Sequence, residues 1–211
     1  MDFSLTEEQL ALKATAQAFA KKELAPLASN IEASNEPLAH DIVKRMASMG
    51  FLGINIPEEL GGLGLSNLDA LIVLEELAKV SSAVAFPAFE ANVGPVHAIR
   101  HFAPEELKQR IVPAVCRGDM IVAVSMSEPD AGTALTDLTT RGVIEGDHVV
   151  LDGAKRWCSG GGHSDAYLIY TRLSDAPGAK GIGAVLVEKG AVGLSFGDPE
   201  TLMGFRGVPS A

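Results

Sequence analysis

The chain has 211 residues, of which 47% are hydrophobic and 21% charged, as in an ordinary globular protein with a buried core. This length accommodates one large or two small domains. A formal net charge of −10 makes the chain a poor general binder of nucleic-acid backbones, although a local basic or N–H-rich patch could hold one phosphorylated ligand.

Signals for export, membrane insertion and metal binding are not seen. The first residues contain no basic segment followed by an apolar core, so no secretory signal is expected. No apolar run reaches the ~18 residues that a bilayer span requires. The two cysteines, Cys116 and Cys158, lie far apart in no metal-like pattern. We therefore expect a cytoplasmic protein without a metal site.

The first half has the spacing of helices. Thr6 and Gln9 predict a capping box, and the apolar residues that follow recur at helical spacing until Pro26 ends or kinks the helix. Met49 is expected to face inward near the end of the second helix, and Gly50 to stop it. Within the apolar stretch 81–102, only the second part is expected to be helical. The further helices are predicted over residues 38–49, 68–80, 92–102 and 104–115.

The connector 51–65 is rich in glycine, with Gly61, Gly62 and Gly64 close together. A phosphate-binding loop is one interpretation, but the segment lacks the lysine and the spacing of that motif. A turn between helices is the simpler interpretation.

His97 and His101 are four residues apart and would share one helix face, as metal ligands do in His-Glu-x-x-His. No glutamate lies between them, Arg100 would repel a dication, and no third ligand is evident. Structural or solvated histidines are the favoured interpretation.

From Asp119 the pattern changes to short alternating strands with turns between them. These features predict an α+β chain, with a helical domain over 1–118 and an antiparallel β-sandwich or barrel domain over 119–211 that is incomplete. The strands are expected at 121–124, 138–144, 148–151, 166–172, 183–187 and 193–196.

The most informative stretch follows the first strand. Ser125, Ser127 and Thr133 supply hydroxyl groups, and Gly132 lets the backbone approach a ligand closely. Such a rim suits a flat ligand with polar edges, or a phosphate. Many strand-to-loop junctions have this composition, so the pattern alone does not identify the ligand.

Three motifs together carry a family resemblance. Met-Ser-Glu-Pro-Asp-Ala-Gly-Thr (126–133) resembles the Thr-Glu-Pro-x-x-Gly-Ser signature of the acyl-CoA dehydrogenases. Leu-Asp-Gly-Ala-Lys-Arg-Trp-Cys-Ser (151–159) resembles that family's Gly-x-Lys-x-Trp-Ile-Thr/Ser motif. Met-Gly-Phe-Arg-Gly-Val-Pro-Ser (203–210) resembles its Gly-x-Arg-x-x-Pro-Thr/Ser stretch. Order, spacing and residue types agree, and the resemblance covers all 211 residues.

The resemblance implies an FAD-dependent enzyme acting on an acyl-CoA thioester. In this family a glutamate base removes the Cα proton, and hydride passes from Cβ to flavin N5. The electrons then go to an electron-transfer flavoprotein or, in oxidase relatives, to oxygen. The redox chemistry belongs to the cofactor, while the protein binds and orients. A homo-oligomer is implied for the full-length protein.

The resemblance also implies which residues contact FAD. Ser127 takes the place of the family's threonine, whose hydroxyl meets flavin N1/O2, although a strand-end cap is the alternative role. Gly132 and Thr133 correspond to the pair near the pyrophosphate, and Thr133 also to the substrate thioester region. The implied cofactor-binding set is Val124, Ser125, Met126, Ser127, Gly132, Thr133, Trp157, Cys158 and Ser159.

Trp157, the only tryptophan, would pack against the flavin ring; a place in the core of the β domain is the alternative. Cys158 replaces the family's isoleucine and is expected to be a packing residue rather than a redox partner. Ser159 corresponds to the residue that meets flavin O4 and N5. Ala134 replaces an aspartate, which removes an expected turn hydrogen bond.

No catalytic residue is expected within these 211 residues. The family places its base in a C-terminal helical domain, and its chains run roughly as long again. Glu128, the acid nearest the motif, is expected to be structural. The chain alone is then inactive. The alternatives are a subunit completed by a partner chain, a truncated sequence, or an oxidase or desulfinase relative.

Overall fold

The computed structural model describes residues 4–211, and the chain forms two compact units. The helical unit contains the residues up to Ile121 together with Leu202–Val208. The β unit contains Val122–Thr201 and Pro209–Ala211. The domain bounds expected from the sequence, 1–118 and 119–211, place 202–208 differently and stay a prediction.

The first helix begins with the predicted capping box. Thr6 Oγ1 accepts from the Gln9 backbone N–H at 3.2 Å, and Gln9 Oε1 accepts from the Thr6 N–H at 3.1 Å. Helix α1 (Glu7–Phe19) is followed by a π-helical turn over Ala20–Leu24, which leads directly into α2 (Ala25–Ser34). Pro26, expected to end or kink the first helix, lies in the first turn of α2. Proline is tolerated there because the first turn of a helix does not need its missing N–H.

The remaining helices agree with the sequence analysis in number except in one place. Residues 82–92 form a helix, although Pro87 interrupts the sequence pattern there. Its small residues Ala83 and Ala88 are fully packed, and this burial outweighs the local cost of proline. Met49, expected to face inward, is 40% exposed. These helices are α3 (His40–Ser48), α4 (Asn67–Ala78), α5 (Ser82–Asn92), α6 (Pro95–Phe102) and α7 (Glu105–Cys116).

A fully buried asparagine anchors the glycine-rich connector to α5. Asn92 Nδ2 donates to the carbonyl groups of Phe51 and Ala88, each at 2.8 Å, and Asn92 Oδ1 accepts from the Ile54 N–H at 2.7 Å. Since every polar atom of this side chain is paired, its hydrogen bonds offset the cost of removing it from water.

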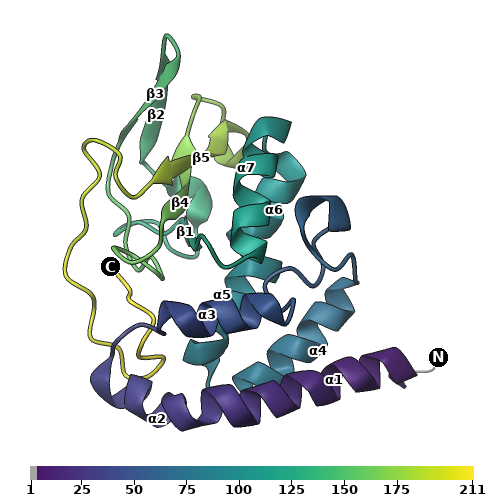
Figure 1. Ribbon diagram of the computed structural model, residues 1–211. Helices are drawn as coiled ribbons and strands as arrows, with labels where there is room; N and C mark the ends of the chain where they lie inside the picture. Colours follow the sequence, from purple (N-terminus) through teal and green to yellow (C-terminus); the bar gives the residue numbers. More distant parts are fainter. Residues whose placement is uncertain (1–3) are drawn as a thin grey trace. The chain divides into compact units, whose positions relative to one another are not determined.

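The β unit contains one five-stranded mixed sheet (Figure 1). Strand β4 pairs in parallel with β1 and, at one residue pair, with β2, and antiparallel with β5; β2 and β3 form an antiparallel hairpin. The hairpin turns at Gly146, whose φ of 65° suits a two-residue turn. The strands are β1 (Val122–Ser125), β2 (Arg141–Glu145), β3 (His148–Asp152), β4 (Ala166–Arg172) and β5 (Ile182–Glu188).

The α+β prediction, with helices first and strands second, is confirmed. The sheet is mixed rather than purely antiparallel, because β1 and β4 pair in parallel and are joined by a long connection instead of a hairpin. The sheet is also not closed. The strand expected at 193–196 does not form. Its alternating apolar residues instead pack on the sheet: Leu194 lies against the core, and the Phe196 ring is 5.0 Å from that of Tyr167.

Among the helices of the described residues, none combines the length and the apolar character needed to cross a lipid bilayer.

Candidate functional site

Two segments of the β unit, 124–128 and 155–159, lie side by side where β1 ends. The Arg156 N–H donates to the Ser127 carbonyl at 2.9 Å, and Lys155 Nζ donates to the Met126 carbonyl at 3.0 Å. Cys158 Sγ lies 3.5 Å from the Val124 carbonyl oxygen. The structure therefore brings together the residues before and around Ser127 with those around Trp157, which the sequence separates by thirty positions.

A buried ion pair fixes this junction. The Glu128 carboxylate accepts from Lys155 Nζ at 2.7 Å, from the Thr140 N–H at 2.9 Å, and from both the N–H and the hydroxyl of Thr139 at 2.6 and 2.8 Å. Burial alone raises the pKa of Glu128, but Lys155, Thr140 and Thr139 outweigh it and lower the pKa to about 2. A carboxylate so weakly basic and so fully hydrogen-bonded is poorly suited to act as a general base.

Trp157 is not part of the core. Its side chain is 52% exposed, and its backbone φ is 57°, in the left-handed region that bulky residues rarely adopt. Hydrogen bonds of its two neighbours hold this conformation: Arg156 N–H to the Ser127 carbonyl, and Cys158 N–H to the Ala211 carbonyl at 2.8 Å. Such strain persists only where the surroundings over-determine it, and it concentrates at functional sites.

The residues after Trp157 pair with the segment 209–211. Ser159 and Ser210 form an antiparallel bridge, and the Gly160 N–H donates to the Pro209 carbonyl at 2.6 Å. The Cys158 side chain packs in the sheet core beside Ala123 and Tyr167 and forms no disulfide within the described residues, which agrees with a packing role. Backbone groups of this segment, rather than the thiol, are therefore what a ligand can meet.

The other predicted site residues differ in their accessibility. Ser125 is buried, whereas Val124, Met126, Ser127 and Ser159 are partly exposed. Gly132 and Thr133 are exposed, and a Cβ built on Gly132 would meet no atom within 4 Å. Open space beside Gly132 is consistent with a ligand approaching the backbone there.

Chemically, this junction can hold a flat heteroaromatic group with polar edges. No described residue forms a hydrogen bond with the hydroxyl of Ser127, Thr133 or Ser159, so all three are free to bond a ligand. The exposed indole of Trp157 supplies an apolar surface for a ring. These residues fit FAD, whose ring system is flat, apolar on its faces and polar along its edges.

Sequence reasoning did not single out two charged residues at this site. The Arg156 guanidinium lies 5.0 Å from the centroid of the Trp157 ring, and Arg156 Nη2 is 3.1 Å from Glu200 Oε1. Arg156 occupies a variable position of its motif, and nothing in the sequence links it to Glu200.

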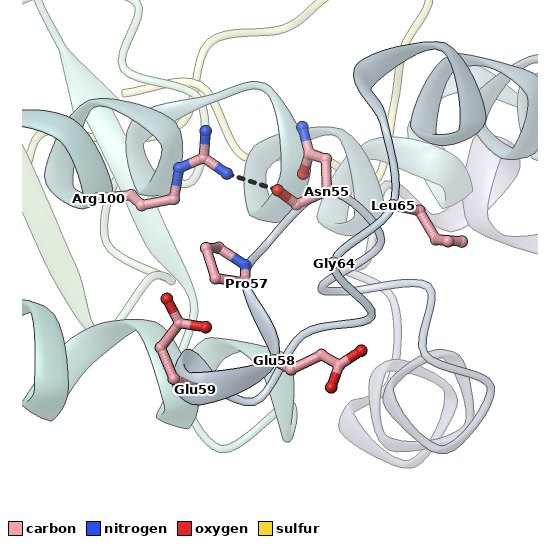
Figure 2. A pocket seen from close by; sticks show the side chains of 7 residues that line it. All are labelled: Asn55, Pro57, Glu58, Glu59, Gly64, Leu65 and Arg100. Atoms are coloured by element: carbon pink, nitrogen blue, oxygen red, sulfur yellow. Dashed lines mark hydrogen bonds between the residues drawn. The ribbon is translucent and has the colours of Figure 1, made fainter.

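A separate polar pocket of about 460 Å³ lies in the helical unit (Figure 2). Arg100 reaches from α6 to the Asn55 carbonyl, and Glu58 and Glu59 project from the connector. The lining residues are Asn55, Pro57, Glu58, Glu59, Gly64, Leu65 and Arg100.

The connector around this pocket is a packed turn rather than a phosphate loop. A Cβ on Gly62 would lie 2.1 Å from the Ile56 carbonyl oxygen, so the glycine is required by close backbone contact. The carboxylates of Glu58 and Glu59 would also repel a phosphate.

His97 and His101 lie in contact on α6, with ring centroids 4.5 Å apart, and His101 Nε2 is 2.8 Å from Arg100 Nη2. Over residues 4–211, no group of three or more histidine, cysteine, aspartate or glutamate side chains is placed to hold a metal ion.

Comparison with known families agrees with the resemblance. Residues 6–119 match the family model described as the acyl-CoA dehydrogenase N-terminal domain, and residues 123–211 match the acyl-CoA dehydrogenase middle domain. A similar curated protein is the 3-sulfinopropanoyl-CoA desulfinase of Variovorax paradoxus, 36% identical over 212 residues that cover 98% of this chain and 52% of that protein.

Solved structures give the same result. The glutaryl-coenzyme A dehydrogenase complex with glutaryl-CoA matches with a TM-score of 0.94 and 30% identity, over 100% of this chain and 54% of that one. The FAD complex of PigA matches with a TM-score of 0.92 and 26% identity, over 100% of this chain and 55% of that one.

The chain thus spans about half the length of the relatives it matches. It belongs to the acyl-CoA dehydrogenase family, and its 211 residues correspond to the N-terminal and middle domains of that family.

Proposed function

We propose that this chain supplies the flavin-binding surface of an FAD-dependent acyl-CoA dehydrogenase. The reaction would remove hydrogen from Cα and Cβ of an acyl-CoA thioester. The observation that carries the proposal is the junction of 124–128 with 155–159, which sets Ser127 and the exposed Trp157 on neighbouring segments of one unit.

In this proposal each residue binds or orients. The Ser127 and Ser159 hydroxyls and the backbone from Val124 to Ser127 bond the polar edges of the flavin, and Trp157 packs on its ring. The backbone at Ser125 and Cys158 contributes while their side chains stay buried. Gly132 and Thr133 accommodate the pyrophosphate, and Thr133 also meets the thioester region. FAD, when bound, accepts the hydride from the substrate.

The proton-abstracting base is proposed to lie outside these 211 residues. Glu128 is unsuited because its carboxylate is held by Lys155 and by Thr139 and Thr140. An electron-transfer flavoprotein is the proposed acceptor, and acceptor assays with the purified full-length protein would test it. The whole protein is proposed to be a homo-oligomer in the cytoplasm. Light scattering of the purified full-length protein would test the oligomeric state.

Titration with FAD tests the flavin site. Trp157 is the only tryptophan, so its fluorescence reports on the site directly. FAD is expected to quench it, and Ser127→Ala should weaken binding about three- to tenfold, the effect of one hydrogen bond to a polar ligand. Ser174→Ala, in an exposed loop of the same unit, is the control. Wild-type fluorescence that does not respond to FAD would contradict the proposal.

A separate experiment tests the proposal that the proton-abstracting base lies outside these 211 residues. Acyl-CoA added to the flavin-loaded chain should leave the visible flavin absorbance unchanged, because no residue here is proposed to remove the Cα proton. Bleaching with turnover would overturn that part of the proposal.

A desulfinase is the second candidate, favoured by the 36% identity to the Variovorax paradoxus enzyme. Release of sulfite from 3-sulfinopropanoyl-CoA by the full-length protein, with no oxidation of unsubstituted acyl-CoA, would select it. Oxygen consumption with acyl-CoA would instead indicate an oxidase. Co-purification with a helical chain would indicate a partner-completed subunit.

A further inference from the structure

Arg156 and Glu200 form a charged pair beside the chain's single tryptophan. The Arg156 guanidinium carbon lies 5.0 Å from the Trp157 ring centroid, a distance at which a guanidinium stacks on an indole face. Arg156 Nη2 is 3.1 Å from Glu200 Oε1. The two charged side chains are 49% and 40% exposed.

The indole needs such a contact to have one orientation. Backbone hydrogen bonds of Arg156 and Cys158 fix the main chain of Trp157 in its left-handed conformation. They do not fix the side chain, which is 52% exposed and is not among the clustered core residues of the sheet, Ala123, Cys158, Tyr167 and Ile169. The stacked guanidinium is a contact that restricts the indole from its exposed side.

We propose that Arg156 is a positioning residue that holds the Trp157 indole, and that Glu200 holds Arg156 in the stacked position. With Arg156 over the ring, the exposed remainder of the indole is what a flat ligand can contact. Identifying that ligand as the FAD ring rests on the proposed function, whereas the holding of the indole does not.

The pair is suited to a clean test because it contributes little to folding. Exposed ion pairs are nearly neutral for stability, so substitutions at Arg156 and Glu200 should leave the thermal midpoint unchanged. A matched control exists in the same unit: Arg141 pairs with Asp175 at 2.8 Å in an exposed position, and no aromatic ring among residues 4–211 stacks on its guanidinium.

The first measurement uses the 211-residue chain without cofactor. In Arg156→Ala, acrylamide should quench Trp157 fluorescence more strongly than in the wild type, and the fluorescence anisotropy should fall. Glu200→Gln should shift both in the same direction by less, Arg156→Lys should retain part of the wild-type signal, and Arg141→Ala should change neither. Wild-type quenching and anisotropy in both Arg156→Ala and Glu200→Gln would overturn the proposal.

The second measurement separates this inference from the proposed function. Arg156→Ala should raise the dissociation constant of FAD about two- to fivefold, the range for an exposed cation–π contact. If the indole of Arg156→Ala becomes more accessible and the wild type does not bind FAD, the positioning role stands and the flavin assignment fails. If FAD binds both chains equally although the indole has moved, the link between Arg156 and the cofactor is wrong.

Discussion

The two units each bury a carboxyl group, and they do so in opposite ways. In the β unit, Glu128 is 3% exposed and receives hydrogen bonds from Lys155, Thr139 and Thr140, and its pKa falls to about 2. On α5 of the helical unit, Glu90 is 5% exposed, forms no hydrogen bond or ion pair with any described residue, and has a pKa raised well above its ordinary value by burial. Partners, and not burial itself, decide the charge of a buried acid.

Lys155→Met should have the largest effect, because it leaves the Glu128 carboxylate buried without its cation. We expect a loss of about 3–5 kcal/mol in the free energy of unfolding of the β unit. Urea unfolding followed by Trp157 fluorescence would measure it. Adding Glu128→Gln to Lys155→Met removes the buried charge while keeping an acceptor for Thr139 and Thr140, and should recover part of the loss. Lys189→Met, on the exposed surface, should cost almost nothing. An equal loss in the single and double variants would mean that the charge pair is not the cause.

Lowering the pH should remove the stabilisation that the Glu128–Lys155 ion pair provides. Since the folded-state pKa of Glu128 lies near 2 and its ordinary value is 4.5, the stabilisation is complete above pH 4.5 and is lost as the pH falls toward 2. The loss amounts to about 3 kcal/mol over that window. Glu128→Gln should flatten this dependence in the β unit, while Asp175→Asn, an exposed acid, should retain it. A wild-type profile without slope there would contradict the ionised, paired state.

Glu90→Gln should have the smallest effect, with the opposite sign. A raised folded-state pKa means that folding keeps a proton, so the favourable contribution is complete below pH 4.5 and is lost as the pH rises. The wild-type helical unit should therefore lose stability relative to Glu90→Gln as the pH rises above that point. Unfolding followed by helical circular dichroism would detect it, with the exposed Glu106→Gln as control. Parallel pH profiles for Glu90→Gln and the wild type would show that Glu90 is not protonated in the folded state.

Local patterns predicted most elements of the fold. The capping box at Thr6 and Gln9, the strand 166–172 and the hairpin turn at Gly146 all depend on neighbouring residues, which a sequence displays directly. Helix α5 was missed because Pro87 is unfavourable locally, and only the packing of its small residues outweighs that. The parallel pairing of β1 with β4 was also missed, since it joins segments some forty positions apart through no recognisable turn.

The features of the candidate site also divide into those that the sequence could indicate and those that it could not. Motif residues such as Ser127 and Trp157 could be singled out because their types and spacing resemble a family. The left-handed backbone of Trp157 and its contact with Arg156 could not, since both depend on tertiary hydrogen bonds. Glu200 lies 44 positions from Arg156 in an irregular segment, and no local signal marks it.

The bridge between Ser159 and Ser210 has a consequence for the order of events during synthesis. It closes a loop of about fifty residues, and such distant pairings form late because the chain must first lose the freedom of the intervening segment. On a translating ribosome, β1 and Trp157 emerge well before Pro209–Ala211. The segment around Trp157 is then expected to lack its final backbone pairing until Pro209–Ala211 has emerged, so this surface should be completed after translation of the region rather than during it.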